Sequence, residues 1–151
     1  SGNGKFINIE YEDKPLEIKF PKVYIPFGIE EKFKNYYLNF QLNNYKNDNY
    51  QNSFLLFIEN LEKQIIEKLG IDKELFNSQI SYRKNDIIMI YTKIMEKFRK
   101  FTTKVYKDNR LLNIFNLGKE INIDGTIIID KIWKIKGKYY YKLKLSNICV
   151  L

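Results

Sequence analysis

Hydrophobic residues recur with helical spacing in one long segment of this chain. They occupy positions i, i+3, i+4, i+7, i+11 and i+15, filled by Phe54, Phe57, Ile58, Leu61, Ile65 and Leu69. This spacing places them on one face of an amphipathic helix. Ser53 is a suitable N-cap and Gly70 a suitable left-handed stop. We therefore predict a helix over 53–69 that packs against a sheet, preceded by a polar loop at 43–52 and followed by a short helical turn near 72–76.

The other hydrophobic segments alternate in polarity or are rich in β-branched residues, and they predict strands. These segments are 16–20, 23–25, 36–42, 87–95, 101–106, 121–135 and 138–145. Pro21 predicts an edge or a bulge, Gly125 a bulge or bend, and Lys136-Gly137 a two-residue hairpin turn. Five or more strands with one helix between them are typical of a small closed barrel or a tight sandwich.

The last predicted hairpin gives the candidate site its first residues. With Lys136-Gly137 as the turn, Trp133 faces Tyr140, Lys131 faces Lys142, and Ile129 faces Lys144. One side of this hairpin then carries Lys131, Trp133, Tyr140, Lys142 and Lys144. The other side is a core face of Ile128, Ile132, Tyr141, Leu143 and Leu145.

Charge divides the chain into two unlike parts. Residues 1–81 hold 10 Lys and Arg and 12 Asp and Glu, a net of −2, whereas residues 82–151 hold 16 and 6, a net of +10. Like charges at facing positions such as Lys131 and Lys142 are unfavourable unless water or an anion separates them. With Trp133, Tyr140 and also Tyr139 available for stacking, the sheet fits single-stranded nucleic acid. The alternative is an ordinary solvated face on which Trp133 fills a barrel end.

A second basic group extends from one strand through a loop into the next. Its lysines and arginines are Lys93, Lys97, Arg99, Lys100 and Lys104, and Arg83 lies just upstream. Tyr91 shares a face with Lys93, and Tyr106 shares one with Lys104. We expect this set to continue the nucleic-acid track around the barrel, although any single member could be a solvated side chain.

Catalysis and cofactors have little support in the residues. The chain has no histidine and a single cysteine, Cys149, so it lacks the usual general base, a zinc ligand set and an internal disulfide. Asp124, Asp130 and Lys131 are residue types found in metal-dependent nuclease sites, but no second carboxylate has a convincing spacing from them. No glycine-rich phosphate loop and no long apolar membrane segment is present. We therefore expect no enzyme activity, no cofactor, no metal and no membrane contact, in a reducing compartment.

Several stretches resemble a known viral family. They are Pro26-Phe27-Gly28, the strand over 36–42, the helix with Glu62 at its centre, the run 104–108, Ile132-Trp133 and the run 138–145. The pattern resembles the OB-fold single-stranded DNA-binding proteins of the phage T7 type, as found in large nucleocytoplasmic DNA viruses. It covers roughly residues 16–151, with residues 1–15 as an N-terminal arm whose Ser1-Gly2 looks like a cloning scar.

This resemblance implies a mainly β protein, a five-stranded OB barrel with one inserted α-helix. It also implies sequence-tolerant binding of single-stranded DNA in replication, recombination and repair, within the host cytoplasm or a viral replication factory. A homodimer is implied as well. So is an acidic C-terminal tail that recruits replication proteins such as polymerase and helicase or primase; the chain ends at Leu151 without one.

Two other functions stay open from the sequence. An RNA-binding OB module would use the same phosphates and base faces, so the residues do not separate it from a DNA-binding one. A non-enzymatic dimerisation or interaction protein would instead use the basic sheet against an acidic protein surface.

Overall fold

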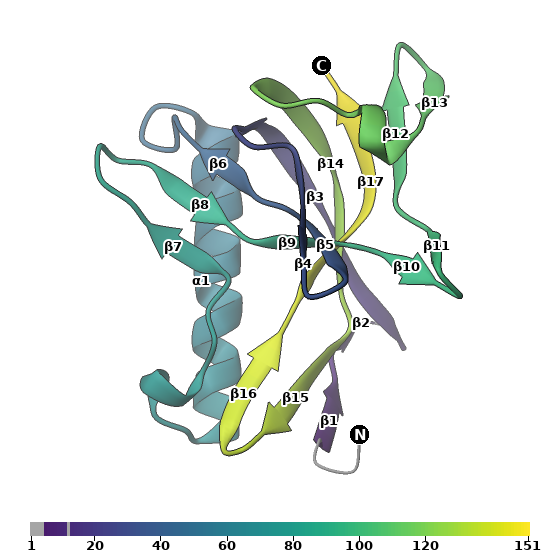
Figure 1. Ribbon diagram of the computed structural model, residues 1–151. Coiled ribbons are helices and arrows are strands. Elements are labelled where there is room, and N and C mark those ends of the chain that lie inside the picture. Colours follow the sequence, from purple (N-terminus) through teal and green to yellow (C-terminus); the bar gives the residue numbers. More distant parts are fainter. Residues whose placement is uncertain (1–4, 12) are drawn as a thin grey trace.

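The computed structural model describes residues 5–11 and 13–151 (Figure 1), so the expected scar at Ser1-Gly2 lies outside the described residues. The helical elements are α1 (Asn49–Leu69), η1 (Lys73–Leu75) and η2 (Ile114–Asn116). The strands are β1 (Lys5–Asn8), β2 (Glu10–Tyr11), β3 (Lys14–Ile25), β4 (Ile29–Lys32), β5 (Asn35–Leu38), β6 (Phe40–Leu42), β7 (Ile80–Tyr82), β8 (Ile88–Ile90), β9 (Thr92–Ile94), β10 (Glu96–Lys97), β11 (Lys100–Phe101), β12 (Lys104–Lys107), β13 (Arg110–Leu112), β14 (Ile121–Ile129), β15 (Lys131–Ile135), β16 (Lys138–Tyr141) and β17 (Leu143–Val150).

Five strand paths form a curled barrel. β3 pairs with β14, β14 with β17, and β17 runs parallel to β9. The paths β5–β6 and β8–β9 then pair antiparallel along their length, and β6 returns to β3 through Tyr24 and Gln41. The order β3, β5–β6, β8–β9, β17, β14 with one parallel pair is that of an OB-fold, and α1 is inserted between its second and third strands. The expected fold class is confirmed.

Helix α1 begins four residues before the expected start. The Asp48 side chain accepts hydrogen bonds from the backbone N–H of Tyr50 (2.9 Å) and of Gln51 (3.2 Å), so it is the N-cap, and Ser53 lies within the helix. The end of the predicted polar loop is therefore helical. Gly70 ends the helix in the left-handed conformation, with φ 62°, as expected, and η1 confirms the predicted short turn.

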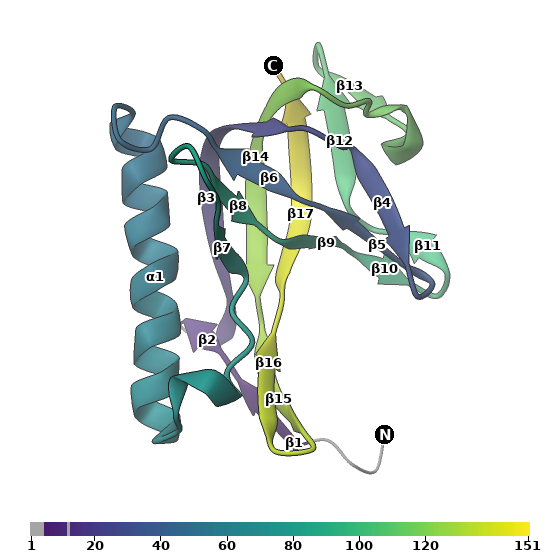
Figure 2. The same cartoon turned by 60° about the vertical axis from the view of Figure 1, so that its left-hand side comes forward.

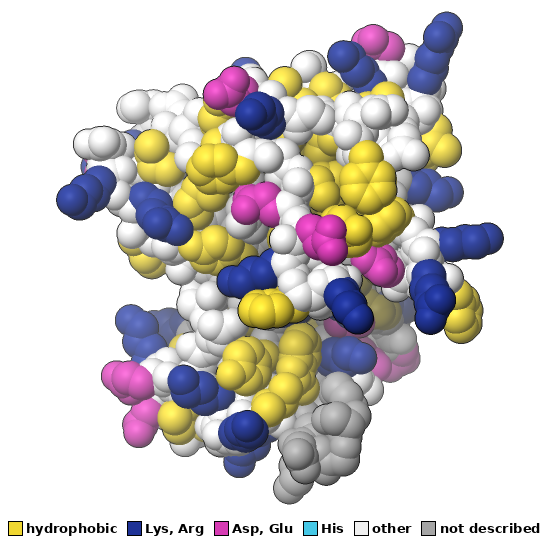
Figure 3. All heavy atoms as spheres, viewed as in Figure 1, with side chains coloured by type: hydrophobic (Ala, Val, Ile, Leu, Met, Phe, Trp, Pro, Cys, Tyr) yellow, Lys and Arg dark blue, Asp and Glu magenta, His cyan; other side chains and the backbone are white. Residues whose placement is uncertain are grey.

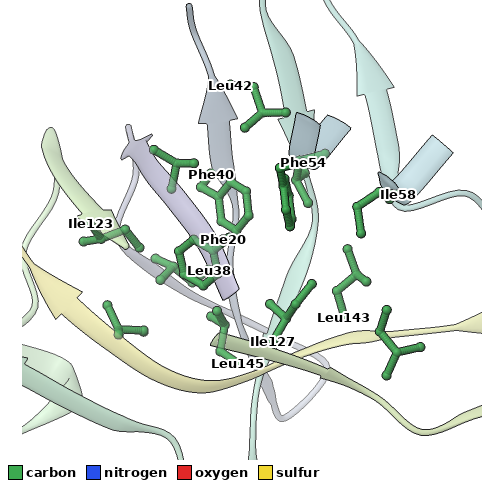
Figure 4. Packing of buried hydrophobic residues seen from close by; sticks show 14 of the residues in the cluster. Phe20, Leu38, Phe40, Leu42, Phe54, Ile58, Ile123, Ile127, Leu143 and Leu145 are labelled. Carbon is green, nitrogen blue, oxygen red and sulfur yellow. The ribbon is translucent and has the colours of Figure 1, made fainter. Parts of the chain in front are cut away.

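The core fills the barrel and continues to the inner face of α1. Phe20 of β3 and Phe40 of β6 stack with ring centroids 4.9 Å apart, and Phe54 of α1 packs against both rings (Figure 4). Figure 2 shows α1 along one side of the barrel, with the tips of the β4–β5 and β10–β11 hairpins on the opposite side. The helix thus covers one face and leaves the β4–β5 and β10–β11 hairpins uncovered.

The predicted bulges are present in the β3–β14 ladder. Its register shifts between Ile123 and Gly125, opposite Pro21, whose missing N–H suits an unpaired position. A Cβ on Gly125 would lie 2.2 Å from the carbonyl oxygen of Asn147, so only glycine fits the ladder here.

The long strand predicted over 121–135 is wrong in one respect: it breaks at Asp130. The predicted register of the last hairpin is confirmed from Ile135 opposite Lys138 to Trp133 opposite Tyr140. Beyond the break it slips by one residue, so Lys144 faces Ile128 instead of Ile129. Ile128 is accordingly half-buried, not a core residue, and Ile127 and Ile129 fill the core in its place.

Candidate nucleic-acid interface

A short row of side chains crosses three neighbouring strands. Tyr37 of β5 lies opposite Lys93 of β9, and Lys93 lies beside Lys144 of β17. All three are half-buried, and they point away from the core because Leu38, Ile94 and Leu145, which follow them along the strands, are buried. Lys142, just before β17, places its Nζ 5.8 Å from the centre of the Tyr37 ring. We call Lys93, Lys142 and Lys144, with Tyr37 among them, the lysine cluster.

The lysines of this cluster repel one another. Partial burial, followed by the charge of Lys144, lowers the pKa of Lys93, although Glu96 opposes the shift. Partial burial, followed by the charges of Lys93 and Lys32, lowers the pKa of Lys142. Lys144 is partly neutralised by Asp130, whose carboxylate lies 3.0 Å from its Nζ. A bound anion would relieve the remaining repulsion.

A groove of about 510 Å³ adjoins the cluster. It is lined by Glu30, Glu31, Lys32, Phe33, Tyr37, Asn39, Asn77, Ser78, Gln79, Tyr91, Thr92 and Lys142. Within it, the Oδ1 atom of Asn39 is buried and has no hydrogen-bond partner. The groove therefore combines two lysines, two glutamates, aromatic rings and an unsatisfied acceptor, so it suits a ligand with hydrogen-bond donors, and its cations lie where it adjoins the lysine cluster.

The β15–β16 hairpin brings two predicted stacking residues together. Trp133 and Tyr140 are a cross-strand pair with ring centroids 6.3 Å apart and planes 23° apart, and both are half-buried. Lys131 lies on their face, opposite Asn8 of β1. Tyr139 points to the other face, where Lys134 approaches its ring at 5.4 Å. The structure thus separates Tyr139 from the Trp133–Tyr140 pair.

Two further predicted residues meet at the groove. Arg83, just after β7, donates a hydrogen bond from Nη2 to the Tyr91 hydroxyl over 2.8 Å. Tyr91 lies between β8 and β9 on the same side as Lys93 and lines the groove. This pair extends the cationic and aromatic surface beyond the lysine cluster.

The remaining predicted residues lie farther along the same chain path. Arg99 is in the turn between β10 and β11. Lys104 and Tyr106 are on β12, which runs parallel to the later part of β17, opposite Asn147 and Cys149. Strands β9 and β12 both pair with β17, and the β10–β11 hairpin connects them.

Sequence reasoning missed Tyr37 and Lys32 because both lie in the acidic part of the chain. Alternation along the strand shows that Tyr37 lies on its polar side, but it does not show which strand lies beside it. Pairing of β5 with β9 carries it into the basic surface, and no local pattern signals that contact. Figure 3 shows basic and hydrophobic side chains interspersed over this face, with some acidic ones near its middle.

The aspartates considered for catalysis have other neighbours. Asp130 pairs with Lys144, and Asp124 faces Cys149, whose thiol pKa is raised by burial and by that carboxylate. Within residues 5–11 and 13–151, no three His, Cys, Asp or Glu side chains gather closely enough to hold a metal ion. No helix in the described part of the chain is long and apolar enough to cross a membrane.

The fold places this chain in the OB class of small β-barrels. Among solved structures it is similar to gp2.5, a single-stranded DNA binding protein encoded by bacteriophage T7, with a TM-score of 0.59. The match covers 89% of this chain and 91% of that one at 8% sequence identity, so the likeness concerns the fold. No family model matches the sequence, and a search of curated proteins gave no match.

Proposed function

We propose that this chain binds single-stranded DNA along the outer face of β5, β9 and β17, without strong sequence preference and without catalysis. The lysine cluster carries the proposal, because it holds mutually repelling cations around an aromatic ring in a partly buried position. Phosphates would neutralise the lysines, and bases would stack on the rings.

Two further observations support this function. The stacked Trp133–Tyr140 pair offers a second aromatic platform on the β15–β16 hairpin. The structural neighbour from phage T7 is a single-stranded DNA binding protein with the same fold. Binding by backbone charge and stacking needs no base-specific hydrogen bonds, which is why we propose tolerance of sequence.

The biological setting belongs to the same proposal. The likeness to a phage protein supports a role in viral DNA replication, recombination and repair. We assign this role to a reducing interior such as the host cytoplasm or a replication factory, to a homodimer, and to an assembly with replication proteins. The lone Cys149 fits such an interior, where no disulfide is needed.

The first test is a titration with oligo-dT at several salt concentrations, followed by the fluorescence of Trp133, the single tryptophan. We expect quenching, and a log–log salt slope of about −3 to −4, which corresponds to roughly 4–6 phosphates neutralised on a single strand. Absence of binding at low salt would overturn the proposal. Stronger competition by a matched RNA oligomer would assign the surface to RNA instead.

A variant locates the aromatic contact. Trp133→Ala should weaken binding of a labelled oligo-dT by about fivefold or more, since stacking on one base contributes about 1–3 kcal/mol. Tyr50→Ala is the matched control, because Tyr50 is a 79% exposed aromatic residue in the first turn of α1, outside the proposed interface. Equal affinities for the Trp133 variant and the wild type would remove Trp133 from the interface.

A further inference from the structure

Two hairpins of the barrel carry the same sequence pattern at their tips. The β4–β5 tip reads Glu31-Lys32-Phe33-Lys34, and the β10–β11 tip reads Glu96-Lys97-Phe98-Arg99. In each hairpin the phenylalanine is the first of the two turn residues. Phe33 is 85% exposed and Phe98 is 88% exposed, and each has the preceding lysine Nζ 5.7 Å from its ring centre. We call these two turns the Phe tips.

The backbone of the Phe tips disfavours phenylalanine. Both have φ 52°, and the residues that follow them have φ 63° and 64°. Tight hairpin turns of this left-handed kind favour Asn, Asp and Gly. The β12–β13 turn follows this preference at both positions with Asp108-Asn109, and the β15–β16 turn follows it at the second with Gly137. Because the rings are also exposed, neither turn geometry nor core packing explains them. Such local conflicts are expected where a function requires the residue.

The two Phe tips belong to one surface. Tyr36 of β5 and Phe101 of β11 meet edge to face with ring centroids 5.0 Å apart, and Phe115 of η2 contacts both rings at 5.6 and 5.3 Å. This triad of rings fixes the bases of the two hairpins against each other. Figure 2 shows both tips projecting from the side of the barrel that faces away from α1.

The β4–β5 tip continues the lysine cluster, and the β10–β11 tip adds cations beside it. Lys32 lies on the same face of the β4–β5 hairpin as Tyr37, and it lines the groove together with Lys142. Both hairpins together carry five cations, Lys32, Lys34, Lys97, Arg99 and Lys100, against three glutamates, Glu30, Glu31 and Glu96. The net charge of the two hairpins is therefore +2, and cations flank each exposed ring.

We propose that Phe33 and Phe98 form a two-ring stacking site for bases of a single strand that leaves the lysine cluster, with the flanking cations on its phosphates. The inference rests on the proposed function and adds two rings that act on bases, Phe33 at the groove and Phe98 on the neighbouring hairpin. Aromatic rings bind bases of any identity, and cations beside them bind the backbone. A polar peptide or a second copy of the chain would not need rings flanked by cations on both sides.

The test compares the double variant Phe33→Asn/Phe98→Asn with wild type in binding to a labelled oligo-dT. Asparagine accepts the left-handed turn, so the variant should fold with unchanged or higher thermal stability. We expect affinity to fall by about tenfold or more with the salt slope unchanged, because rings and not phosphate contacts are removed. The double variant Phe33→Trp/Phe98→Trp should retain wild-type affinity, and Tyr50→Ala is the control for an exposed ring elsewhere.

A second oligomer sharpens the interpretation. A strand of abasic sites keeps the phosphates and lacks the bases, so wild type and the Asn double variant should bind it equally. Unchanged affinity of the Asn double variant for oligo-dT, with normal wild-type binding, would overturn the Phe-tip site and leave the proposed function intact. Loss of self-association at unchanged DNA affinity would also overturn it, since the tips would then be a protein interface. A wild type that binds no single strand would contradict the proposed function itself.

Discussion

At the scale of single residues, one buried carboxylate joins three segments of the molecule. Glu62 of α1 accepts hydrogen bonds from the Ser78 hydroxyl (2.5 Å), from the backbone N–H of Gln79 (3.0 Å) and from the Tyr141 hydroxyl. Tyr141 is fully buried and stacks on Phe76 with ring centroids 5.4 Å apart. These bonds connect the helix to the base of the β15–β16 hairpin, so the hairpin that carries Trp133 is anchored from the core side.

This anchor makes stability depend on pH in a predictable direction. Burial, followed by the negative charge of Glu62, raises the pKa of Tyr141 well above its ordinary value of 10.0. The folded state therefore keeps the tyrosine proton while the unfolded state loses it above pH 10. This contribution to stability is complete below pH 10 and is lost as the pH rises toward the folded pKa.

We predict that Tyr141→Phe lowers the free energy of unfolding by about 1.5–3 kcal/mol at pH 7, because it removes a hydrogen bond to a buried carboxylate. The difference from wild type should shrink by about 1.4 kcal/mol at pH 11, where only the wild type loses stability through this group. Urea unfolding at pH 7, 9 and 11 measures both effects. Tyr82→Phe, at an exposed tyrosine bonded to Glu59, is the control for the cost at pH 7 and should cost less. A difference that stays constant with pH would contradict the assigned protonation of Tyr141.

At the scale of elements, α1 is defined by its ends. Gln51 in its first turn donates from Nε2 to the Lys22 carbonyl (3.0 Å) and accepts from the Asn44 N–H (2.8 Å). The bulge of β3 near Pro21 thus presents a carbonyl that the helix uses. The start of the helix is consequently fixed by both the Asp48 cap and the β3 bulge.

The cap gives a paired prediction. Asp48→Ala should lower the free energy of unfolding by about 1 kcal/mol, because two N–H groups of the first turn lose their acceptor. Ser53→Ala should leave it unchanged or slightly higher, since Ser53 is an exposed residue inside the helix and alanine is the better helix former. Urea unfolding followed by circular dichroism compares the two variants. A larger loss for Ser53→Ala would mean that the helix begins where the sequence had predicted.

The same elements show what the sequence could and could not predict. The Lys136-Gly137 turn and the pairing beside it depend on local chemistry, and both were predicted correctly. The one-residue slip beyond Asp130 arises where β14 leaves β3 and β15 joins β1, which is a tertiary effect. A slip of one residue reverses the faces of a strand, so the core assignment of Ile128 failed with it.

The residues of the candidate site also divide into those that the sequence indicates and those that only the strand pairing reveals. Lys93, Lys142 and Lys144 are candidates from the sequence because charge and alternation are visible in a single segment. Tyr37 is not, because its place in the site depends on pairing across 56 residues (93 minus 37). Phe33 and Phe98 did leave a sequence signal, the repeated Glu-Lys-Phe-cation pattern, but its meaning needs the left-handed turns and the exposure of both rings.

At the scale of the whole molecule, the barrel mixes two parts of opposite charge. Strand β5, from the part with net charge −2, lies against β9, from the part with net charge +10. The cations of the lysine cluster nevertheless stay close together, and their lowered pKa values mean that folding disfavours their charged forms. The fold therefore loses some stability at neutral pH to maintain a positive surface.

This conflict between stability and binding gives the last prediction. Lys93→Gln/Lys142→Gln should raise the free energy of unfolding at pH 7 by up to about 1 kcal/mol, since repulsion between partly buried charges is removed. The gain should vanish as the pH rises past the ordinary lysine value of 10.5. Binding of oligo-dT should weaken, with the salt slope reduced by about 0.7 for each phosphate that the variant no longer neutralises.

Lys68→Gln is the matched control, because Lys68 is exposed in the last turn of α1. Its positive charge is favourable at a helix C-terminus, so this variant should lose a little stability and keep its affinity for DNA. A higher free energy of unfolding for Lys93→Gln/Lys142→Gln and a lower one for Lys68→Gln would show that the lysine cluster is maintained for a ligand and not for the fold. A double variant that loses stability and keeps both affinity and salt slope would instead make Lys93 and Lys142 structural residues, and the DNA path would have to lie elsewhere on the barrel.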